Sequence, residues 1–212
     1  MGKGTYSRAI AKALGVPHIS TGDILRREVA AGTKLGKAVK GYMERGLLVP
    51  DSIINLVVEK RLSQPDCARG FVLDGYPRTL SQARFLESRF PVDVAVLLEA
   101  PDDVIVERVS GRLVCPRCGA TYHVKWKPPK VPGICDVCGA KLVRRRDDDP
   151  EVVRERLRLY RETIRPVVDY YRGLGKLLEF DASIDSREGI PLLLEKLKAF
   201  RAARPYAQAV HV

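Results

Sequence analysis

The sequence has few aromatic residues and no long apolar stretch. Phenylalanine, tryptophan and tyrosine make up 7% of the 212 residues, and tryptophan occurs once. No apolar run approaches the roughly 20 residues that a membrane-spanning helix requires. The first residues also lack the apolar region of a secretory signal peptide. A membrane span and secretion are therefore not expected, and the predicted location is the cytoplasm.

Acidic residues are outnumbered by basic ones. The chain has 37 Lys and Arg against 26 Asp and Glu, which gives a net charge of +11. Such a charge favours anionic partners, among them nucleotides, nucleic acids and acidic membranes. Many arginines stand singly inside ordered segments, which favours a cleft around a small polyphosphate over one basic stripe on a long helix. Hydrophobic residues make up an ordinary 45%, as expected for one globular domain with inserts.

Short apolar segments alternate with helical patterns. Strands are predicted at 16–20, 70–74, 94–98 and 177–181, and helices at 5–14, 51–62 and 102–112. A long helix is expected to begin at Asp149-Pro150, and Pro166 should kink or interrupt it. Continuous apolar centres are typical of strands buried on both faces of a sheet. This alternation predicts a parallel α/β sheet that binds ligands beyond the carboxyl ends of its strands.

Two segments interrupt the alternation and are predicted to be inserts. Residues 21–49 have a helical pattern but no strand, and residues 111–148 are rich in Gly, Pro, Cys and Lys. The core domain would then comprise residues 1–20, 50–110 and 149–212.

The second insert contains four of the five cysteines. Cys115-x-x-Cys118 and Cys135-x-x-Cys138 are separated by 16 residues, and Gly-Ala follows each pair. Two such pairs let four thiolates converge on one ion, and four thiolates suit tetrahedral zinc without leaving a position for water. A structural zinc site is predicted, with iron as the lesser alternative. Cys67 stands alone and is expected to be a core or surface thiol.

Several short motifs follow one another in a specific order. They are GKGT at 2–5, ISTGDILR at 19–26, LDGYPRT at 73–79 with Gln82 beyond it, and RRDD at 145–148. GKGT alone is a weak sign of a phosphate-binding loop, but the combination is specific. From residue 2 to about residue 200, the chain resembles adenylate kinases of the bacterial type with a long, zinc-binding lid. Asp147 and Asp148 could pair with arginines in the closed lid or simply begin the next helix.

The resemblance implies a fold, an activity and a division into domains. The fold would be the three-layer, parallel-sheet P-loop fold of nucleoside monophosphate kinases. The activity would be the reversible transfer of a phosphoryl group from ATP to AMP, giving two ADP. Residues 21–49 would form the AMP-binding insert, and residues 111–148 the zinc-ribbon lid over ATP.

The resemblance also implies a ring of cations, because phosphoryl transfer depends on positioning and charge neutralisation. The catalytic residues would be Lys3, Asp74, Arg78, Arg112, Arg145 and Arg156. Asp74 would organise Mg²⁺ through water. ATP would be bound by Gly2, Lys3, Gly4, Thr5, Arg108, Arg112, Tyr122 and Ala182. AMP would be bound by Thr21, Gly22, Arg26, Val49, Gly75, Arg78, Gln82, Arg145 and Arg156.

The sequence departs from the family at two places. Family members have a buried strand and Gly-x-Pro-Gly-x before the GKGT string, whereas here only Met1 precedes Gly2. Without that strand, a gap in the parallel sheet and unpaired backbone groups are expected. Ala182 also stands where the family usually has a glycine that contacts the ATP base.

Three alternatives remain open from the residues alone. One is another nucleoside monophosphate kinase, acting on UMP, CMP or GMP or using GTP as donor. Another is a zinc-ribbon protein that binds nucleic acid, and the third is a relative made inactive by the shortened loop. The favoured hypothesis has ATP, AMP and ADP as partners, acts as a monomer, and involves neither nucleic acid nor a membrane.

Overall fold

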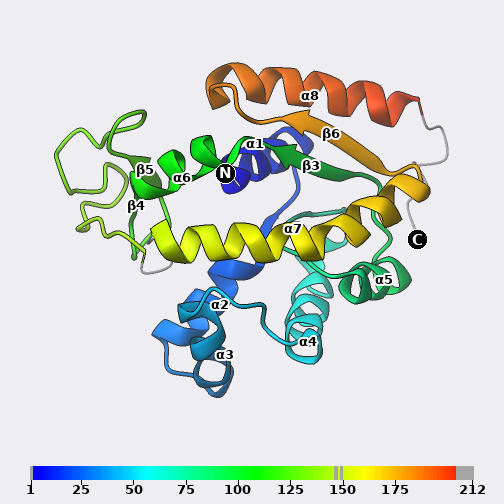
Figure 1. Ribbon diagram of the computed structural model, residues 1–212, viewed down its shortest axis with the longest axis horizontal. Coiled ribbons are helices and arrows are strands. Elements are labelled where there is room, and N and C mark those ends of the chain that lie inside the picture. The colour runs from blue at the N-terminus through cyan, green and yellow to red at the C-terminus, as the bar shows by residue number, and fades with distance from the viewer. Residues whose placement is uncertain (1, 146–147, 149, 204–212) are drawn as a thin grey trace.

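A computed structural model describes residues 2–145, 148 and 150–203 of the chain. Helices surround short parallel strands, and two extensions project from this core (Figure 1). The elements are α1 (Lys3–Leu14), β1 (His18–Ser20), α2 (Thr21–Ala30), α3 (Lys34–Glu44), α4 (Asp51–Leu62), η1 (Pro65–Cys67), β2 (Val72–Asp74), α5 (Leu80–Arg89), β3 (Ala95–Glu99), α6 (Asp102–Ser110), β4 (Arg112–Val114), β5 (Thr121–His123), α7 (Pro150–Gly173), β6 (Leu177–Asp181) and α8 (Ser186–Ala202).

The core strands form two parallel pairs. β1 pairs with β2, with Ser20 opposite Asp74, and β3 pairs with β6, with Glu99 opposite Asp181. A helix precedes or follows each strand, so the predicted parallel α/β arrangement is confirmed. The carboxyl ends of β1 and β2 place the Ser20 and Asp74 positions side by side, where ligands of such sheets bind.

The predicted gap in the sheet lies between these two pairs. Among the described residues, no strand connects β2 to β3, and both strands line the same cavity. The hydroxyl groups of Tyr6 and Tyr171 are buried beside this cavity and have no hydrogen-bond partner in the described part of the chain. The strands β2 and β3 are half-buried rather than fully buried, because one edge of each faces the gap.

Helices cover both faces of the β3–β6 pair. Leu178 and Phe180 of β6 pack in one apolar cluster with Leu193 of α8 and Tyr6 of α1. Leu177 points into another cluster, which contains Tyr171 of α7. Alternate residues of a strand point to opposite faces, so this division follows from the strand's period of two. In Figure 1, α8 lies above this strand pair and α7 below it.

The first extension is the pair of helices α2 and α3, at the lower left of Figure 1. Ser20 caps α2 by accepting a hydrogen bond from the Asp23 backbone N–H, and Thr33 caps α3 in the same way from Gly36. Gly36 is required at the crossing of the two helices, because a Cβ there would lie 2.1 Å from the Glu28 carbonyl oxygen. The helical pattern predicted for 21–49 is thus confirmed as two helices.

The second extension is the cysteine-bearing segment after α6. β4 and β5 form an antiparallel ribbon, with Leu113 opposite Tyr122, and isolated bridges join Val114 to Val143 and Ile134 to Lys141. A small cluster including Cys115, Tyr122 and Leu142 forms its interior. This segment therefore has a core of its own, separate from the α/β core.

Several element boundaries differ from those predicted. The bounds of α4 and β6 match, but α6 ends at Ser110 and Arg112 already belongs to β4. Of the two effects expected of Pro166, a kink or an interruption, the interruption is not found, because α7 continues to Gly173. Tertiary packing explains this continuity. Leu157 before the proline and Val167 after it are both buried, and their burial outweighs the lost hydrogen bond.

Two helices had no predicted counterpart, namely α5 and α8. The expected start of the long helix at Asp149 lies outside the described residues. No helix within the described residues is long and apolar enough to cross a membrane.

Candidate active site

A cavity of about 1370 Å³ opens at the carboxyl ends of β1 and β2 and continues into the gap between β2 and β3. Its outer part lies between the start of α1 and the β4–β5 ribbon. The charged residues predicted for phosphate binding gather along it: Lys3, Asp74, Arg78, Arg108, Arg112 and Arg145 all line this cavity. Charged side chains from distant parts of the chain therefore meet in one cleft.

The GKGT segment forms the entrance to α1. Gly2 is the N-cap and adopts the left-handed conformation at φ 60°, which glycine tolerates without strain. Lys3 begins the helix, and its Nζ lies 6.0 Å from the centre of the Tyr160 ring. Thr5 is exposed on the same turn and lines the cavity. The positive end of the α1 dipole and Lys3 together favour an anion at this point.

Asp74 lies at the end of β2, directly beside this segment. Its side chain is 12% exposed, and Oδ2 lies 3.6 Å from Nε2 of His18. Burial raises the pKa of Asp74, but the interaction with His18 and the positive charges of Lys3 and Arg78 outweigh it, so the net pKa is lowered. Asp74 is therefore an ionised carboxylate at neutral pH, which suits a hydrated Mg²⁺. No role for His18 was predicted from the sequence.

Gly4 shows how closely the loop approaches its surroundings. A Cβ on Gly4 would lie 3.4 Å from Asp74 Oδ2 and 3.4 Å from Nη1 of Arg8. The absence of a side chain thus leaves room for the carboxylate and the guanidinium at the floor of the cleft.

The turn after Asp74 positions Arg78. Gly75 has φ 86° and lies against Thr21, while the Tyr76–Pro77 peptide bond is cis. The Arg78 Nε donates to the Gly75 carbonyl at 2.7 Å, which fixes the start of the guanidinium. Arg78 also lines the cavity, so its guanidinium lies where a phosphate would bind.

Gln82 is buried and held at both ends of its amide. It is 3% exposed, its Oε1 accepts from the Arg78 backbone N–H at 2.7 Å, and its Nε2 donates to Asp51 Oδ1 at 2.7 Å. The alternative of an exposed helix glutamine is therefore wrong. Gln82 itself does not line the cavity. Its role in binding AMP stays a prediction.

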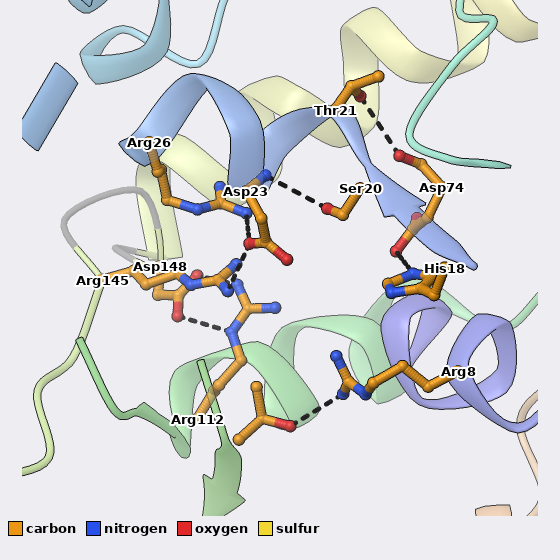
Figure 2. A network of polar contacts seen from close by, with 11 residues as sticks. Arg8, His18, Ser20, Thr21, Asp23, Arg26, Asp74, Arg112, Arg145 and Asp148 are labelled. Carbon is orange, nitrogen blue, oxygen red and sulfur yellow. Dashed lines mark hydrogen bonds and ion pairs between the residues drawn. The ribbon is translucent and has the colours of Figure 1, made fainter. Parts of the chain in front are cut away.

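The ISTGDILR segment places the start of α2 beside Asp74, as Figure 2 shows. Thr21 is buried, and its Oγ1 donates to the Asp74 carbonyl at 3.3 Å. Gly22 lies under the Arg26 guanidinium, since a Cβ there would be 3.0 Å from Arg26 Nη2. Val49 is buried and does not line the cavity, although the neighbouring Leu48 does.

Asp23 joins this segment to the base of the ribbon. Its Oδ1 accepts from Nη2 of Arg26 at 2.6 Å and from Nη2 of Arg145 at 3.5 Å (Figure 2). Burial raises the pKa of Asp23, but the hydrogen bond and charge of Arg26, with Arg145, lower it overall. No role for Asp23 was predicted from the sequence. Its position within the ISTGD string, between Gly22 and Arg26, is the feature of the sequence that could have indicated a role for it.

A second carboxylate holds Arg112. The Arg112 Nε donates to Oδ2 of Asp148 at 2.9 Å, and Nη2 donates to Oδ1. Asp148 is 7% exposed, so the carboxylate is nearly dry. Of the two roles considered for this aspartate, pairing with an arginine is the one found, and its partner Arg112 begins the cysteine-bearing segment. Asp147 lies outside the described residues, as does the side chain of Arg156 in α7.

The opposite wall of the cleft is formed by Arg108 and the loop after β6. The Arg108 guanidinium donates to the carbonyls of Ala182, Ser183 and Ile184, the latter two at 2.6 and 3.0 Å. Ala182 is buried, and its N–H donates to the Glu99 carbonyl. No described residue other than glycine has a positive φ, so alanine is accommodated there. The contacts of Arg108 and Ala182 with a nucleotide base stay predictions.

Tyr122 connects the cleft to the cysteine cluster. It is buried, its hydroxyl lies 3.5 Å from Cys135 Sγ, and it accepts from the Asp136 N–H at 2.8 Å. Its neighbour His123 stacks on Trp126 with ring centres 4.1 Å apart, and its Nδ1 accepts from the Lys125 N–H. His123 is therefore turned to the cleft wall rather than to the cysteines.

The four predicted cysteines converge. Their sulfurs all lie within 4.8 Å of one another, with Cys115 and Cys138 at 3.4 Å and Cys118 and Cys135 at 3.5 Å. Sulfurs around tetrahedral zinc are about 3.8 Å apart, given Zn–S bonds of about 2.3 Å. The Tyr122 hydroxyl lowers the pKa of Cys135, which favours a thiolate. The cluster thus fits a tetrahedral metal ion, and Cys67 is buried elsewhere.

Comparisons with known proteins point to one family. The family model described as adenylate kinase matches residues 1–176. An adenylate kinase of Kosmotoga olearia is 49% identical over 189 residues, which cover 87% of this chain and 88% of the relative. Adenylate kinases of Methanosarcina mazei and Caldicellulosiruptor saccharolyticus are 46% and 48% identical, over 95% and 84% of this chain and 94% and 85% of their own lengths.

Proposed function

The chain belongs to the adenylate kinase family, and we propose that it uses the cleft described above to transfer the terminal phosphoryl group of ATP to AMP, giving two ADP. The observation that carries this proposal is the convergence of Lys3, Arg78, Arg112 and Arg145 on one cavity beside the ionised Asp74. Four cations around one carboxylate match the needs of a reaction between two polyanions held with Mg²⁺.

The donor side would be the start of α1 and the facing wall. Gly2 to Thr5 would hold the ATP phosphates at the helix N-terminus, with Lys3 as the neutralising charge. Arg108, Tyr122 and the loop at Ala182 would lie along the base and ribose. Asp74 would hold Mg²⁺ through water, and the ion would neutralise charge on the phosphates.

The acceptor side would be the start of α2 and the turn after β2. Thr21, Gly22 and Arg26 would contact AMP together with Val49, Gly75 and Gln82. Arg78 would grip the AMP phosphate beside the transferred group, since it lines the cavity and its Nε is fixed on the Gly75 carbonyl. An AMP phosphate is already anionic, so the transfer needs no strong general base.

We assign residues 21–49 to the AMP-binding insert, residues 111–148 to the lid, and the rest to the core. Closure of the lid would bring Arg112 and Arg145 onto the phosphates, with Arg156 from α7, and would exclude water from the transferred group. Asp23 and Asp148 would hold these arginines in place. All these residues come from one chain, so we propose that the protein acts as a monomer.

We propose zinc as the ion held by Cys115, Cys118, Cys135 and Cys138. Four thiolates leave no open position, so the ion would stiffen the lid without taking part in the chemistry. The small apolar cluster around Cys135 and Leu142 gives the lid little core of its own, which is the usual reason for such a metal site.

The test is ADP formation from ATP, AMP and Mg²⁺. The same assay is repeated with UMP, CMP or GMP in place of AMP and with GTP in place of ATP. We expect turnover with ATP and AMP, and a fall in kcat of about a hundredfold or more for Lys3→Met. Lys12→Met changes an exposed lysine at the other end of the same helix and should leave kcat unchanged. Equal turnover in the two variants, or faster turnover with another nucleotide pair, would contradict the assignment.

A second experiment tests the alternative that the chain is a relative made inactive by its shortened loop. The same assay is run on a version extended before Gly2 by an apolar strand and a glycine-rich segment, designed for the gap between β2 and β3. If only the extended version forms ADP, the gap limits activity and the residue assignments stand. If both fold and neither forms ADP, the proposed use of the cleft is wrong.

A further inference from the structure

Helix α1 carries a cation that none of the sequence motifs includes. The Arg8 side chain extends from α1 toward the ribbon, and its Nη2 donates to Thr121 Oγ1 at 3.1 Å (Figure 2). The two residues are 113 positions apart in the sequence. Thr121 is the first residue of β5, so this hydrogen bond connects the core of the protein to the segment that we assign as the lid.

The place of Arg8 links the connection to the donor side of the cleft. Both Arg8 and Thr121 line the cavity, together with Lys3 and Arg108. The Arg8 guanidinium also lies over Gly4, because a Cβ on Gly4 would be 3.4 Å from Nη1 and 3.8 Å from Nη2. One side chain therefore touches the phosphate-binding segment and reaches the ribbon.

Arg8 differs from the neighbouring arginines in the groups that contact its guanidinium. Arg26 and Arg145 share Asp23, and Arg112 is held by Asp148. In the described part of the chain, no carboxylate lies within 4.0 Å of Arg8, and its hydrogen bond goes to a neutral hydroxyl. Arg8 thus lines the cavity without an ion pair of its own among the described residues, and a polyphosphate would supply a counter-charge.

We propose that Arg8 is a positioning residue that latches the lid over the donor nucleotide through Thr121. The proposal rests on the proposed function, because it concerns the same cleft. The hydrogen bond can form only when β5 lies against α1, so it stabilises the closed arrangement relative to any open one. A ligand's affinity falls when its binding-competent state is less populated, so loss of the latch weakens ATP binding more than AMP binding, in which the lid takes part only through Arg145.

The first test compares Arg8→Gln and Thr121→Val with Lys12→Gln. The control removes a positive charge from the same helix at an exposed position away from the cavity. Loss of one hydrogen bond of this kind predicts a rise of about two- to tenfold in KM for ATP in both latch variants. KM for AMP should rise less than KM for ATP, and kcat should stay equal or rise, since lid opening often limits turnover. Thr121→Ser keeps the hydroxyl and should restore the wild-type KM.

The second test measures lid closure directly. Trp126 is the only tryptophan in the sequence and lies five residues after Thr121, so its fluorescence reports on the lid. Titration with ATP and Mg²⁺ should give a signal that saturates at higher ATP in Arg8→Gln than in the wild type. The double variant Arg8→Gln/Thr121→Val should be no worse than either single variant, because both remove the same interaction.

The outcomes separate the latch from the proposed function. Wild-type protein that binds ATP but forms no ADP would contradict the proposed function while the titrations still test Arg8. Equal titrations and equal KM for ATP in wild type and Arg8→Gln would overturn the latch. So would additive effects in the double variant, or an equal rise in KM for both nucleotides.

Discussion

The Arg112 guanidinium holds the Asp148 carboxylate with two hydrogen bonds, across 36 positions of the sequence. Arg112 begins β4 and Asp148 lies just before Pro150, the first residue of α7, so the pair ties the two ends of the cysteine-bearing segment together. The side chain of Asp148 is 4% exposed and that of Arg112 is 28% exposed. Figure 2 shows the pair beside the Asp23–Arg145 contact.

Asp148→Asn should destabilise the protein by about 1–3 kcal/mol, because it leaves Arg112 without its buried counter-charge. Urea unfolding gives this value. Asp102→Asn is the matched control, since Asp102 pairs with Arg161 at a site where both side chains are exposed. That change should cost less than about 1 kcal/mol. Equal losses in the two variants would mean that burial of the Asp148 pair contributes nothing.

Cys135→Ser should release the metal. Cys135 is 2% exposed at the centre of the lid cluster, and removal of one of four thiolates leaves an incomplete site. Zinc bound per chain, measured by elemental analysis, should fall from about one to near zero. Thermal unfolding should occur at lower temperature, and a chelator should do the same to the wild type. Cys67→Ser, outside the cluster, should keep the zinc; loss of zinc from that variant instead would contradict the assignment.

Asp23→Asn should weaken the junction between α2 and the lid in a pH-dependent way. The folded pKa of Asp23 is below its ordinary value, so its contribution is complete above the unfolded pKa of about 3.9 and is lost as the pH falls through the folded value. The difference in unfolding free energy between wild type and Asp23→Asn should thus be constant near neutral pH and shrink below about pH 4. Because Asp23 is 45% exposed, the difference should stay below about 1 kcal/mol.

Urea unfolding of both proteins between neutral and acid pH checks this dependence. KM for AMP should also rise in Asp23→Asn. Asp169→Asn, which breaks an exposed pair with Arg172 on α7, should leave KM unchanged. A difference that grows toward acid pH would contradict a lowered pKa of Asp23 in the folded protein.

Two glycines of α3 should respond to alanine in opposite ways. Gly36→Ala would place Cβ 2.1 Å from the Glu28 carbonyl oxygen, so α2 and α3 must separate, at a cost of about 1–3 kcal/mol or more. Gly41→Ala meets only the Arg45 guanidinium at 3.9 Å and should stabilise the helix by about 0.5–1 kcal/mol. Thermal unfolding distinguishes them, and a stabilising Gly36→Ala would refute the close crossing.

Elements with a local signal could be predicted from the order of the residues. The bounds of α4 and β6 follow from apolar spacing, and the four cysteines are recognisable because their pairs and following glycines define a metal site. The gap between the strand pairs was expected from the family resemblance, because family members have a buried strand before the GKGT string. The ordered motifs were enough to indicate the family.

Features that depend on contacts between distant residues emerged only from the folded chain. Pro166 does not interrupt α7, because burial of Leu157 and Val167 on either side of it outweighs the loss of one hydrogen bond. Asp23 and Arg8 contact the lid across 122 and 113 positions, distances over which no local pattern carries information. Local propensity sets the elements, but the pairing of charges in the cleft is fixed only when packing brings the side chains together.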